Sequence, residues 1–436
     1  MWSTFLRIRV RDSVVAIFHE LHPDPVFCSS KEWEQVQRDE AASVSWLADA
    51  LRERRLIVTS DKEDEQERRR VEAELERKFS RPTILYLMTA QGCNLTCDYC
   101  PVPNIARTHG ATKLSLDDAI AGIDLWKAHV RDANEPEHEY FVIFYGGEPL
   151  LNKEVIPPAL EYLSKERDSG ALPAKVRFMI ATNGILVDND VVSLCKRYDV
   201  SVAVGLDGTR SLHDLHKPDI DGNGTYDRVK ETIRLLIENG IRTFVSATIT
   251  PESLEDLCES SNLMKELGVE KFGFNFLKGS LTRTLVGNGK LTEYYREAAR
   301  GVVAHARHVG TGYEYQMEKK RVAFETRDFF PPDCTCYGNQ LVIQPDGQIS
   351  HCPFTKANLG HVRDVPLTFR ISEQPLVKSW RTRLRFDRPG DAKALEGGGC
   401  AWSMSELANN PLAEDESATL FAEEALDELI WSRYRN

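Results

Sequence analysis

The chain has 436 residues, and 42% of them are hydrophobic, which is enough for two or three domains with buried cores. Its formal net charge of −12 argues against a DNA or RNA partner, because phosphate binding requires clustered lysine and arginine. Arg7 and Arg9 interrupt the stretch that would be apolar in a signal peptide, and no apolar run is long enough to span a membrane. We therefore expect a cytoplasmic protein without a nucleic-acid or membrane partner.

The first part of the chain predicts a small α+β domain within residues 1–80. Residues 5–10 and 14–21 are typical of strands, and residues 31–38 and 43–53 have helix-like patterns. Residues 61–78 place opposite charges three or four positions apart, which is typical of a solvated helix. We interpret this last helix as a connector to the next domain.

From residue 84 onward, strand-like and helix-like stretches alternate. Strands are expected at 84–90, 140–145, 176–181, 200–206, 243–249 and 271–277, and helices at 115–131, 153–167, 188–197, 226–238 and 252–267. This alternation predicts βαβ units and a parallel sheet, so the fold class is α/β. Six strands favour a partial (β/α)6 barrel over residues 81–290, while a closed barrel or an open sheet also fits. In each of these folds, ligands bind at the carboxyl ends of the strands.

The rest of the chain changes character twice. Residues 291–330 predict a charged helical linker. Residues 331–405 combine short strands and turns with four cysteines and predict a Cys-rich domain. Residues 406–436 contain an acidic amphipathic helix, expected at 413–433.

Ten cysteines occur, and seven of them fall into two groups. In the cytosol thiols stay reduced, so clustered cysteines indicate metal ligands or catalysis rather than disulfides. The groups are Cys93, Cys97 and Cys100, and Cys334, Cys336, Cys352 and Cys400.

The first group has the spacing C-x3-C-x2-C and follows the first barrel strand. Three thiolates that are close in sequence can hold a 4Fe-4S cluster and leave one iron without a protein ligand. The amino and carboxylate groups of S-adenosylmethionine can chelate that iron, and an electron from the cluster can then cleave the cofactor to a 5′-deoxyadenosyl radical. The alternative is a zinc site in which His109 is the fourth ligand.

Polar or glycine-rich motifs follow the other strands of the predicted barrel. Each motif alone is typical of a turn. Their common position behind the cysteine loop instead predicts one binding site at this edge of the sheet. The motifs are Gly146-Gly147-Glu148-Pro149, Thr182-Asn183-Gly184, Asp207-Gly208 and Leu277-Lys278-Gly279.

Together, these motifs make residues 84–280 resemble the radical S-adenosylmethionine (SAM) superfamily. The resemblance implies that the backbone of Tyr99 lies near the adenine and that residues 146–149 contact the methionine amino group of the cofactor. The candidate cofactor-binding residues are Tyr99, Gly146, Gly147, Glu148, Pro149, Thr182, Asn183, Asp207, Lys217, Arg228 and Leu277.

The chain departs from the family pattern after the fourth strand. Related enzymes usually carry Ser-x-Asp-Gly there, and the serine helps to hold the cofactor, whereas this chain has Gly205. Related enzymes also often carry H-D-x-x-R, where this chain reads His213-Asp214-Leu215-His216-Lys217. Lys217 or Arg228 could supply a cation for the carboxylate of the cofactor, and the sequence does not choose between them.

The second group contains four cysteines, enough to ligate every iron of an auxiliary 4Fe-4S cluster that passes electrons but has no open site. Residues 341–352 between them predict a hairpin with a Pro-Asp-Gly turn. Three glycines precede Cys400 and would let the backbone approach a bulky cofactor. A structural zinc site is the alternative, although the two closely spaced pairs that zinc ribbons favour are missing.

The spacing of this group resembles the auxiliary-cluster domains of SPASM and Twitch proteins. A full SPASM domain would carry further cysteines, and none follows Cys400, so the Twitch form with one auxiliary cluster is favoured. Enzymes with this two-part layout often modify ribosomally made peptides. The resemblance therefore implies hydrogen abstraction from a precursor peptide and formation of a thioether or carbon–carbon crosslink.

The implied partners are a precursor peptide with a leader sequence and an electron donor such as flavodoxin or ferredoxin. The N-terminal segment resembles a leader-peptide recognition element, which would bind the leader as an added strand, and a packing extension of the barrel fits equally well. Alternative functions are a radical dehydrogenase or maturase acting on a small molecule or a sulfatase-type protein, a zinc-stabilised scaffold, and an iron–sulfur sensor. Asp207, Tyr313 and Glu314 are candidate general bases, and the sequence favours none of them.

Overall fold

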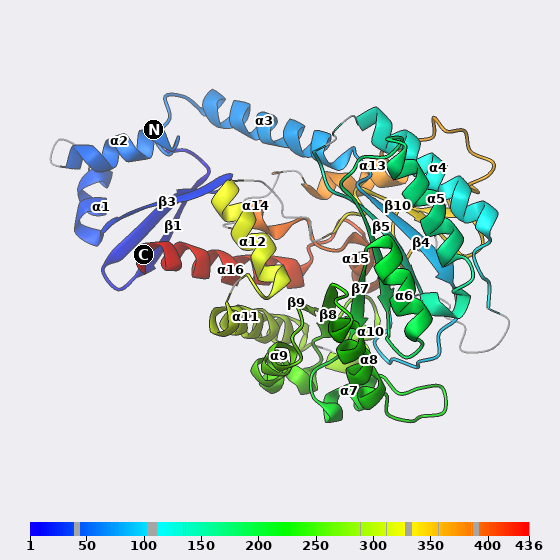
Figure 1. Ribbon diagram of the computed structural model, residues 1–436. Coiled ribbons are helices and arrows are strands. Elements are labelled where there is room, and N and C mark those ends of the chain that lie inside the picture. Colours follow the sequence, from blue (N-terminus) through cyan, green and yellow to red (C-terminus); the bar gives the residue numbers. More distant parts are fainter. Residues whose placement is uncertain are drawn as a thin grey trace.

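A curved eight-stranded sheet with helices along its outside forms the centre of the molecule (Figure 1). The computed structural model describes residues 1–38, 44–102, 111–133, 135, 137–287, 289–310, 312–327, 334–355, 357–384, 386 and 392–435. A separate sheet of three strands lies near the N-terminus.

The six predicted barrel strands are confirmed, and neighbouring strands pair in parallel and in sequence order. They are β4 (Ile84–Ala90), β5 (Tyr140–Gly146), β6 (Val176–Thr182), β7 (Val200–Gly205), β8 (Thr243–Thr248) and β9 (Lys271–Asn275). The helices between them are α4 (Leu116–Ala133), α5 (Ile156–Asp168), α6 (Asn189–Tyr198), α7 (Arg210–His216), α8 (Tyr226–Glu238) and α9 (Leu257–Glu266). The helix expected at 252–267 begins late, since Pro251–Asp256 forms the 3-10 turn η3.

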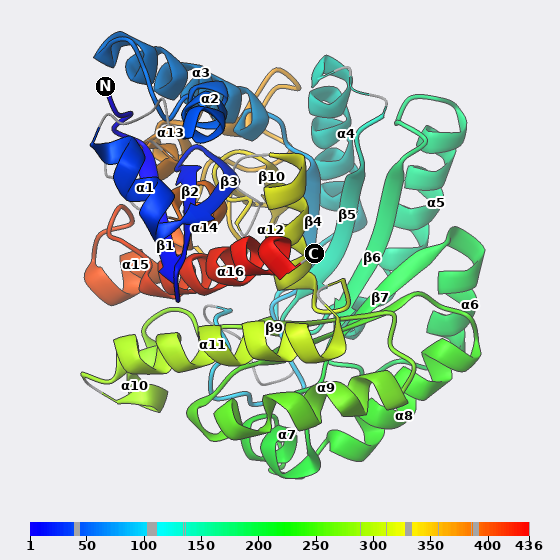
Figure 2. The same cartoon turned by 90° about the vertical axis from the view of Figure 1, so that its left-hand side faces the viewer.

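Side chains of the barrel strands alternate between two environments, as the pleat of a strand requires. On β5, Val142 and Phe144 are fully buried in the main core beneath the outer helices, which Figure 2 shows along the outside of the sheet. On the opposite face, Ile143 and Tyr145 are half-buried. The outer face therefore supplies the stability of the barrel, and the inner face is left for a ligand.

The hairpin predicted at 341–352 is confirmed, and it extends the barrel sheet. Strand β10 (Gln340–Ile343) pairs in parallel with β4, and β11 (Ile349–Ser350) pairs antiparallel with β10. The Cys-rich part of the chain, predicted as a domain of its own, thus shares one sheet with the barrel.

The N-terminal sheet is antiparallel, in the order β1 (Leu6–Arg11), β2 (Val14–His19), β3 (His22–Ser29). One face packs on α1 (Ser30–Gln37) and α2 (Ser45–Glu53) through a separate hydrophobic cluster. The other side contacts the C-terminal helix α16 (Glu416–Arg435), where Phe27 meets Trp431 and Arg11 pairs with Asp427. The first and last segments of the chain therefore pack together, as Figure 2 shows.

The connector helix α3 (Asp61–Phe79) is confirmed as a helix, but it is not solvated on all sides. Val71, Leu75 and Phe79 are buried against the Cys-rich segment. The spacing of the charged residues predicts the exposed face of α3. These apolar residues form its other face, which packs against the Cys-rich segment.

The remaining elements cover the open side of the barrel and the Cys-rich segment. They are α10 (Leu281–Val286), α11 (Leu291–Val309), α12 (Tyr315–Thr326), α13 (Pro375–Arg381), α14 (Lys393–Glu396), α15 (Ala401–Ala408) and the 3-10 turns η2 (Pro149–Asn152), η4 (Ile371–Glu373) and η5 (Thr382–Leu384). Within the part of the chain that the structure describes, no helix has the length and apolar character needed to cross a bilayer.

Candidate functional site

The first cysteine group lies on the loop that leaves β4. The amide of Leu95 and the Nδ2 atom of Asn183 approach the sulfur of Cys93 at 3.4 and 3.7 Å. Burial raises the pKa of Cys93 to about 11 and that of Cys97 to about 12, and the neighbouring Cys100 thiol adds to both shifts. Buried thiols that ionise poorly on their own, as Cys93 and Cys97 do, fit a bound cationic cluster, which would supply the missing positive charge.

Two glycines let the loop after β5 lie directly against the cysteine loop. A Cβ atom on Gly147 would stand 2.2 Å from the carbonyl oxygen of Gly92, and one on Gly146 would stand 2.5 Å from that of Ala90. The amide of Gly147 donates to Ala90 at 2.9 Å, and that of Glu148 donates to Gly92 at 2.8 Å. The glycines of this motif therefore fix the position of the cysteine loop as well as their own turn.

Glu148 links the motif after β5 to the motif after β6. Its carboxylate accepts hydrogen bonds from the hydroxyl of Thr182 at 2.7 Å and from the amides of Asn183 and Leu150 at 2.8 and 3.0 Å. The side chain is fully buried, and burial raises its pKa. In this structure the predicted cofactor residues Glu148, Thr182 and Asn183 thus form one connected group, with Pro149 buried at the start of η2.

Lys217 occupies the space left by the missing serine side chain at position 205. Its Nζ atom donates to the carbonyl of Gly205 at 2.8 Å and lies 2.6 Å from where a Cβ atom on that glycine would be. Lys217 is buried, and its charge lowers the pKa of Cys97 against the larger effect of burial. By contrast, Arg228 donates to the carbonyls of Ile185 and Val187. Of the two candidate cations, Lys217 lies at the cysteine site.

The residues that replace the family's H-D-x-x-R motif have structural partners. His213 accepts the amide hydrogen of Asp207 through Nδ1 at 3.2 Å. The Asp214 carboxylate accepts two amide hydrogens at the start of α8, both at 2.8 Å. These contacts hold the loop after β7 in place.

Asp207 is buried, and its carboxylate accepts the hydroxyl of Tyr99 and the amide of Thr248. Tyr99 therefore ties the cysteine loop to the ends of β7 and β8. Leu277, the last candidate cofactor contact, is buried in the main core just after β9.

Of the remaining candidate general bases, Glu314 has a capping position. It is fully buried, and its carboxylate accepts the amides of Phe274 at 3.1 Å and Met317 at 2.6 Å, so it joins β9 to the start of α12. Burial raises its pKa to about 7. Tyr313 donates no hydrogen bond from its buried hydroxyl within the described structure, and burial raises its pKa to about 12.

The second cysteine group is assembled from three places in the chain. The sulfurs of Cys334 and Cys336 are 3.1 Å apart, Cys352 follows β11, and Cys400 caps α15 by accepting the amide of Ser403 at 3.4 Å. All four thiols belong to or pack against one hydrophobic cluster that also contains residues of α3. A set of sulfur donors in an apolar setting fits an iron–sulfur cluster.

The three glycines before Cys400 let the backbone lie close to neighbouring protein side chains. All three have positive φ angles, between 66° and 78°, and Gly398 and Gly399 are crowded by protein atoms: Tyr337, Leu384 and Asp415 lie within 3.1 Å of their would-be Cβ atoms. The Tyr337 hydroxyl donates to the carbonyls of Gly398 and Gly399 at 2.7 and 2.9 Å. The sequence analysis did not single out Tyr337, because an isolated tyrosine carries no positional signal.

A row of aromatic side chains connects the inner face of the barrel with the second group. Ring centroids are 6.1 Å apart for Tyr86 and Tyr145, 6.5 Å for Tyr145 and Phe354, and 5.3 Å for Phe354 and Trp402. Tyr86 and Tyr145 stand on neighbouring strands β4 and β5, and Phe354 and Trp402 each follow a cysteine of the second group by two residues. The row therefore spans from the barrel to the Cys-rich segment.

Tyr145 lies within electrostatic reach of both thiol groups. Its pKa is raised mainly by burial, and thiols of the first group (Cys100, Cys93) and of the second (Cys352) add to the shift. The two groups thus face the same inner region of the barrel.

The zinc alternative stays a prediction that the described residues do not test. His109, the fourth ligand of that alternative, lies outside the described residues.

Residues 87–264 match a family model described as the radical SAM superfamily. The cysteine-type anaerobic sulfatase-maturating enzyme of Clostridium novyi (strain NT) is 27% identical over 173 residues, which are 38% of this chain and 44% of that protein. The radical SAM cyclopropyl synthase TigE of Paramaledivibacter caminithermalis is 22% identical over 298 residues, which are 64% of this chain and 59% of that protein. The matches thus span about half the length of these two relatives.

Solved structures of one protein share the fold over most of the chain. The structure of anSMEcpe with bound AdoMet has a TM-score of 0.65 at 18% identity and covers 81% of this chain and 96% of that chain. The structure of anSMEcpe with bound AdoMet and Cp18Cys peptide has a TM-score of 0.64 at 19% identity and covers 81% and 99%. The predicted α/β partial barrel is therefore confirmed. Residues 87–264 therefore carry a radical SAM domain.

Proposed function

We propose that this enzyme cleaves SAM to a 5′-deoxyadenosyl radical and uses it to form a thioether or carbon–carbon crosslink in a ribosomally made precursor peptide. In this proposal Cys93, Cys97 and Cys100 hold the SAM-binding 4Fe-4S cluster. An auxiliary 4Fe-4S cluster is held by Cys334, Cys336, Cys352 and Cys400. The observation that carries the proposal is the aromatic row that joins Tyr145, at the inner face of the barrel, to Phe354 and Trp402, which each follow a cysteine of the second group by two residues.

The protein's part in the reaction is to hold the cofactor and the target side chain. Lys217 is the cation that binds the cofactor's carboxylate, because its ammonium lies beside the cysteine loop and the end of β7. Glu148, together with Thr182 and Asn183, orients the methionine end of the cofactor, because the Glu148 carboxylate joins the motifs after β5 and β6. Tyr86 and Tyr145 present half-buried aromatic surface to the target side chain.

Bond formation removes two hydrogens from the peptide. When bound, the cluster and SAM supply the radical that takes one hydrogen atom and leaves as 5′-deoxyadenosine. The second hydrogen leaves as a proton, and its electron passes to the auxiliary site. The aromatic row from Tyr145 to Trp402 lies along that route.

Two relatives support a peptide or protein substrate. The relative from Clostridium novyi is named as a sulfatase-maturating enzyme, and anSMEcpe has been solved with a peptide bound. The N-terminal sheet gives such a peptide a place to bind by strand addition, because β1 and β3 are its two edge strands. Pro23 and Pro25 remove two backbone donors from β3, which favours β1 as the accepting edge.

Anaerobic reaction of the full chain with SAM, dithionite and short peptides encoded beside its gene tests the proposal. Mass spectrometry should detect 5′-deoxyadenosine and a peptide lighter by two hydrogen atoms, and the Cys100→Ala chain should give neither. No 5′-deoxyadenosine under strong reductant would reject the radical chemistry. Release of 5′-deoxyadenosine with every peptide unchanged would reject the peptide substrate and favour a small molecule.

A further inference from the structure

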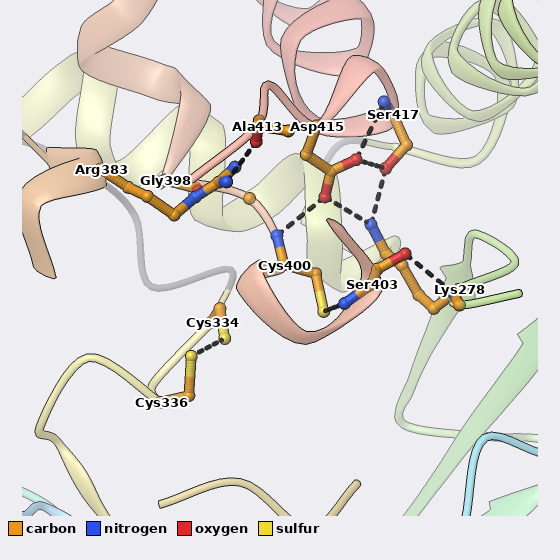
Figure 3. A network of polar contacts seen from close by, with 12 residues as sticks. Lys278, Cys334, Cys336, Arg383, Gly398, Cys400, Ser403, Ala413, Asp415 and Ser417 are labelled. Carbon is orange, nitrogen blue, oxygen red and sulfur yellow. Dashed lines mark hydrogen bonds and ion pairs between the residues drawn. The ribbon is translucent and has the colours of Figure 1, made fainter. Parts of the chain in front are cut away.

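Lys278, in the loop after β9, reaches across to the second cysteine group. Its ammonium donates to the hydroxyl of Ser417 at 2.6 Å and lies 3.1 Å from the Oδ2 atom of Asp415 (Figure 3). The Asp415 side chain is only 1% exposed, so this is a buried ion pair on the aspartate side. The ion pair therefore joins the barrel to the start of the C-terminal helix α16.

The carboxylate of Asp415 is held at both oxygens. Oδ2 accepts the amide of Cys400 at 2.8 Å as well as the ammonium of Lys278. Oδ1 accepts the amide of Ser417 at 3.1 Å and its hydroxyl at 2.6 Å. With these four donors its lone pairs are used, so the carboxylate is fixed and in turn fixes the backbone of Cys400.

A second route from the same loop ends on the sulfur of Cys400. The amide of Gly279 donates to the hydroxyl of Ser403 at 2.8 Å, and the amide of Ser403 donates to the Cys400 sulfur at 3.4 Å (Figure 3). A Cβ atom on Gly279, whose φ is +76°, would lie 2.5 Å from the Trp402 ring. Lys278 and Gly279, neighbours in the barrel loop, thus connect to one cysteine at two atoms. Lys278 reaches the amide of Cys400 through Asp415, and Gly279 reaches its sulfur through Ser403.

Two cations lie beside the second cysteine group: Lys278 reaches Cys400 through Asp415, and Arg383 binds the loop that precedes Cys400. Arg383 is engaged by carbonyl groups of Gly398 and Pro411. Lys278 is therefore a cation within electrostatic reach of the second group. Its counter-ion, Asp415, binds Cys400 of that group.

We propose that Lys278 and Asp415 are positioning residues of the auxiliary cluster: Asp415 holds Cys400, and Lys278 supplies a positive charge that raises the reduction potential of the cluster. This inference rests on the proposed function, because it requires a cluster on Cys400. Buried ion pairs seldom stabilise a fold over an apolar pair, so stability alone is a poor reason for this one. A cation near a cluster favours the reduced, more negative state, and a carboxylate disfavours it.

The potential of the auxiliary cluster tests the proposal directly. The parent is the full chain with Cys93, Cys97 and Cys100 replaced by alanine, so that only the second group can bind a cluster. Its midpoint potential is measured by redox titration monitored by electron paramagnetic resonance. Lys278→Met should lower the potential, and Asp415→Asn, which keeps an acceptor for Cys400, should raise it. The midpoint potential of the double variant should lie close to that of the parent, and Lys278→Arg should have the same potential as the parent.

A matched control is Lys165→Met, which breaks an exposed ion pair with Glu161 on α5 and should leave the potential unchanged. Opposite shifts in the two single variants support the proposal, because a purely structural pair would change iron content without opposite shifts. Unchanged potentials, or shifts of the same sign, overturn it. If Lys278→Met does not retain iron, Asp415→Asn decides alone: a raised potential supports the proposal, and an unchanged one rejects it. A parent that binds no iron rejects the auxiliary cluster of the proposed function and this inference with it.

Discussion

The ammonium of Lys217 fills the space in which a side chain at Gly205 would lie, with 2.8 Å between Nζ and the glycine carbonyl oxygen. Position 205 carries serine in the usual family pattern, and the two positions are 12 residues apart on either side of α7. Lys217 stands where the family's H-D-x-x-R pattern has arginine, so a lysine in place of arginine and a glycine in place of serine meet at one point of the structure.

The first prediction concerns this cation. Lys217→Met should weaken SAM binding by roughly 10- to 100-fold, because a hydrogen bond to a charged group contributes about 1.5–3 kcal/mol. Equilibrium binding of SAM to the reconstituted chain measures the effect. Arg228→Met is the control, since Arg228 donates to loop carbonyls, and its affinity should stay near that of the wild type. Equal losses in both variants would contradict the assignment.

The second prediction concerns the close contact between two loops. Gly147→Ala places a methyl group 2.2 Å from the Gly92 carbonyl oxygen, so the cysteine loop must move. Iron content after reconstitution should fall by roughly half, because only the first cluster is lost. Gly312→Ala serves as the control, as its added Cβ atom would meet nothing nearer than 3.8 Å. Full iron content in Gly147→Ala would show that the loop tolerates the displacement.

The third prediction concerns the second cysteine group. Cys352→Ala should still release 5′-deoxyadenosine but form no crosslinked peptide, because the electron left on the peptide has no acceptor. Mass spectrometry reads both products from one reaction. Cys258→Ala, which changes an exposed thiol, should keep both. Unchanged peptide product from Cys352→Ala would remove the auxiliary cluster from the reaction.

The fourth prediction is a pH dependence of stability caused by Glu314. Burial raises its pKa from the ordinary 4.5 to about 7 in the folded protein, so the folded state binds the proton more tightly. Its contribution to stability is complete below pH 4.5 and is lost as the pH rises through 7. Between pH 6 and 8.5 this loss is about 1.4 kcal/mol.

Thermal unfolding of the wild type and Glu314→Gln at those two pH values checks this effect. The wild type should lose more stability than the variant between pH 6 and pH 8.5, because glutamine does not ionise. Glu318→Gln is the matched control on the same helix, because Glu318 pairs with Arg321 and its pKa is lowered. A wild-type loss no greater than that of Glu314→Gln would mean that Glu314 does not titrate in this range.

The barrel could be predicted from the sequence because its strands are long apolar runs separated by amphipathic helices. Residues such as Val142 and Phe144 recur at the spacing that a strand buried on one face requires. The polar motifs were equally accessible, since each follows a strand and all strands share one carboxyl edge. Their grouping around Cys93 and Glu148 follows from topology alone.

Other features left no local signal. Strand β10 has four residues, and its pairing with β4 joins Gln340 to Ile84, a contact that no neighbouring sequence encodes. Lys278 and Asp415 are likewise single residues 137 positions apart. Such contacts are settled by packing of the whole chain, so a pattern of local periodicity does not reveal them.

Because β10 and β4 share a hydrogen-bond ladder, the hairpin that leads to Cys352 is anchored to the strand that leads to Cys93. The distance between the two cysteine groups is then set at folding and does not depend on a hinge. Under the function proposed above, one bound pose has to serve both groups, so the substrate has to fit a fixed span.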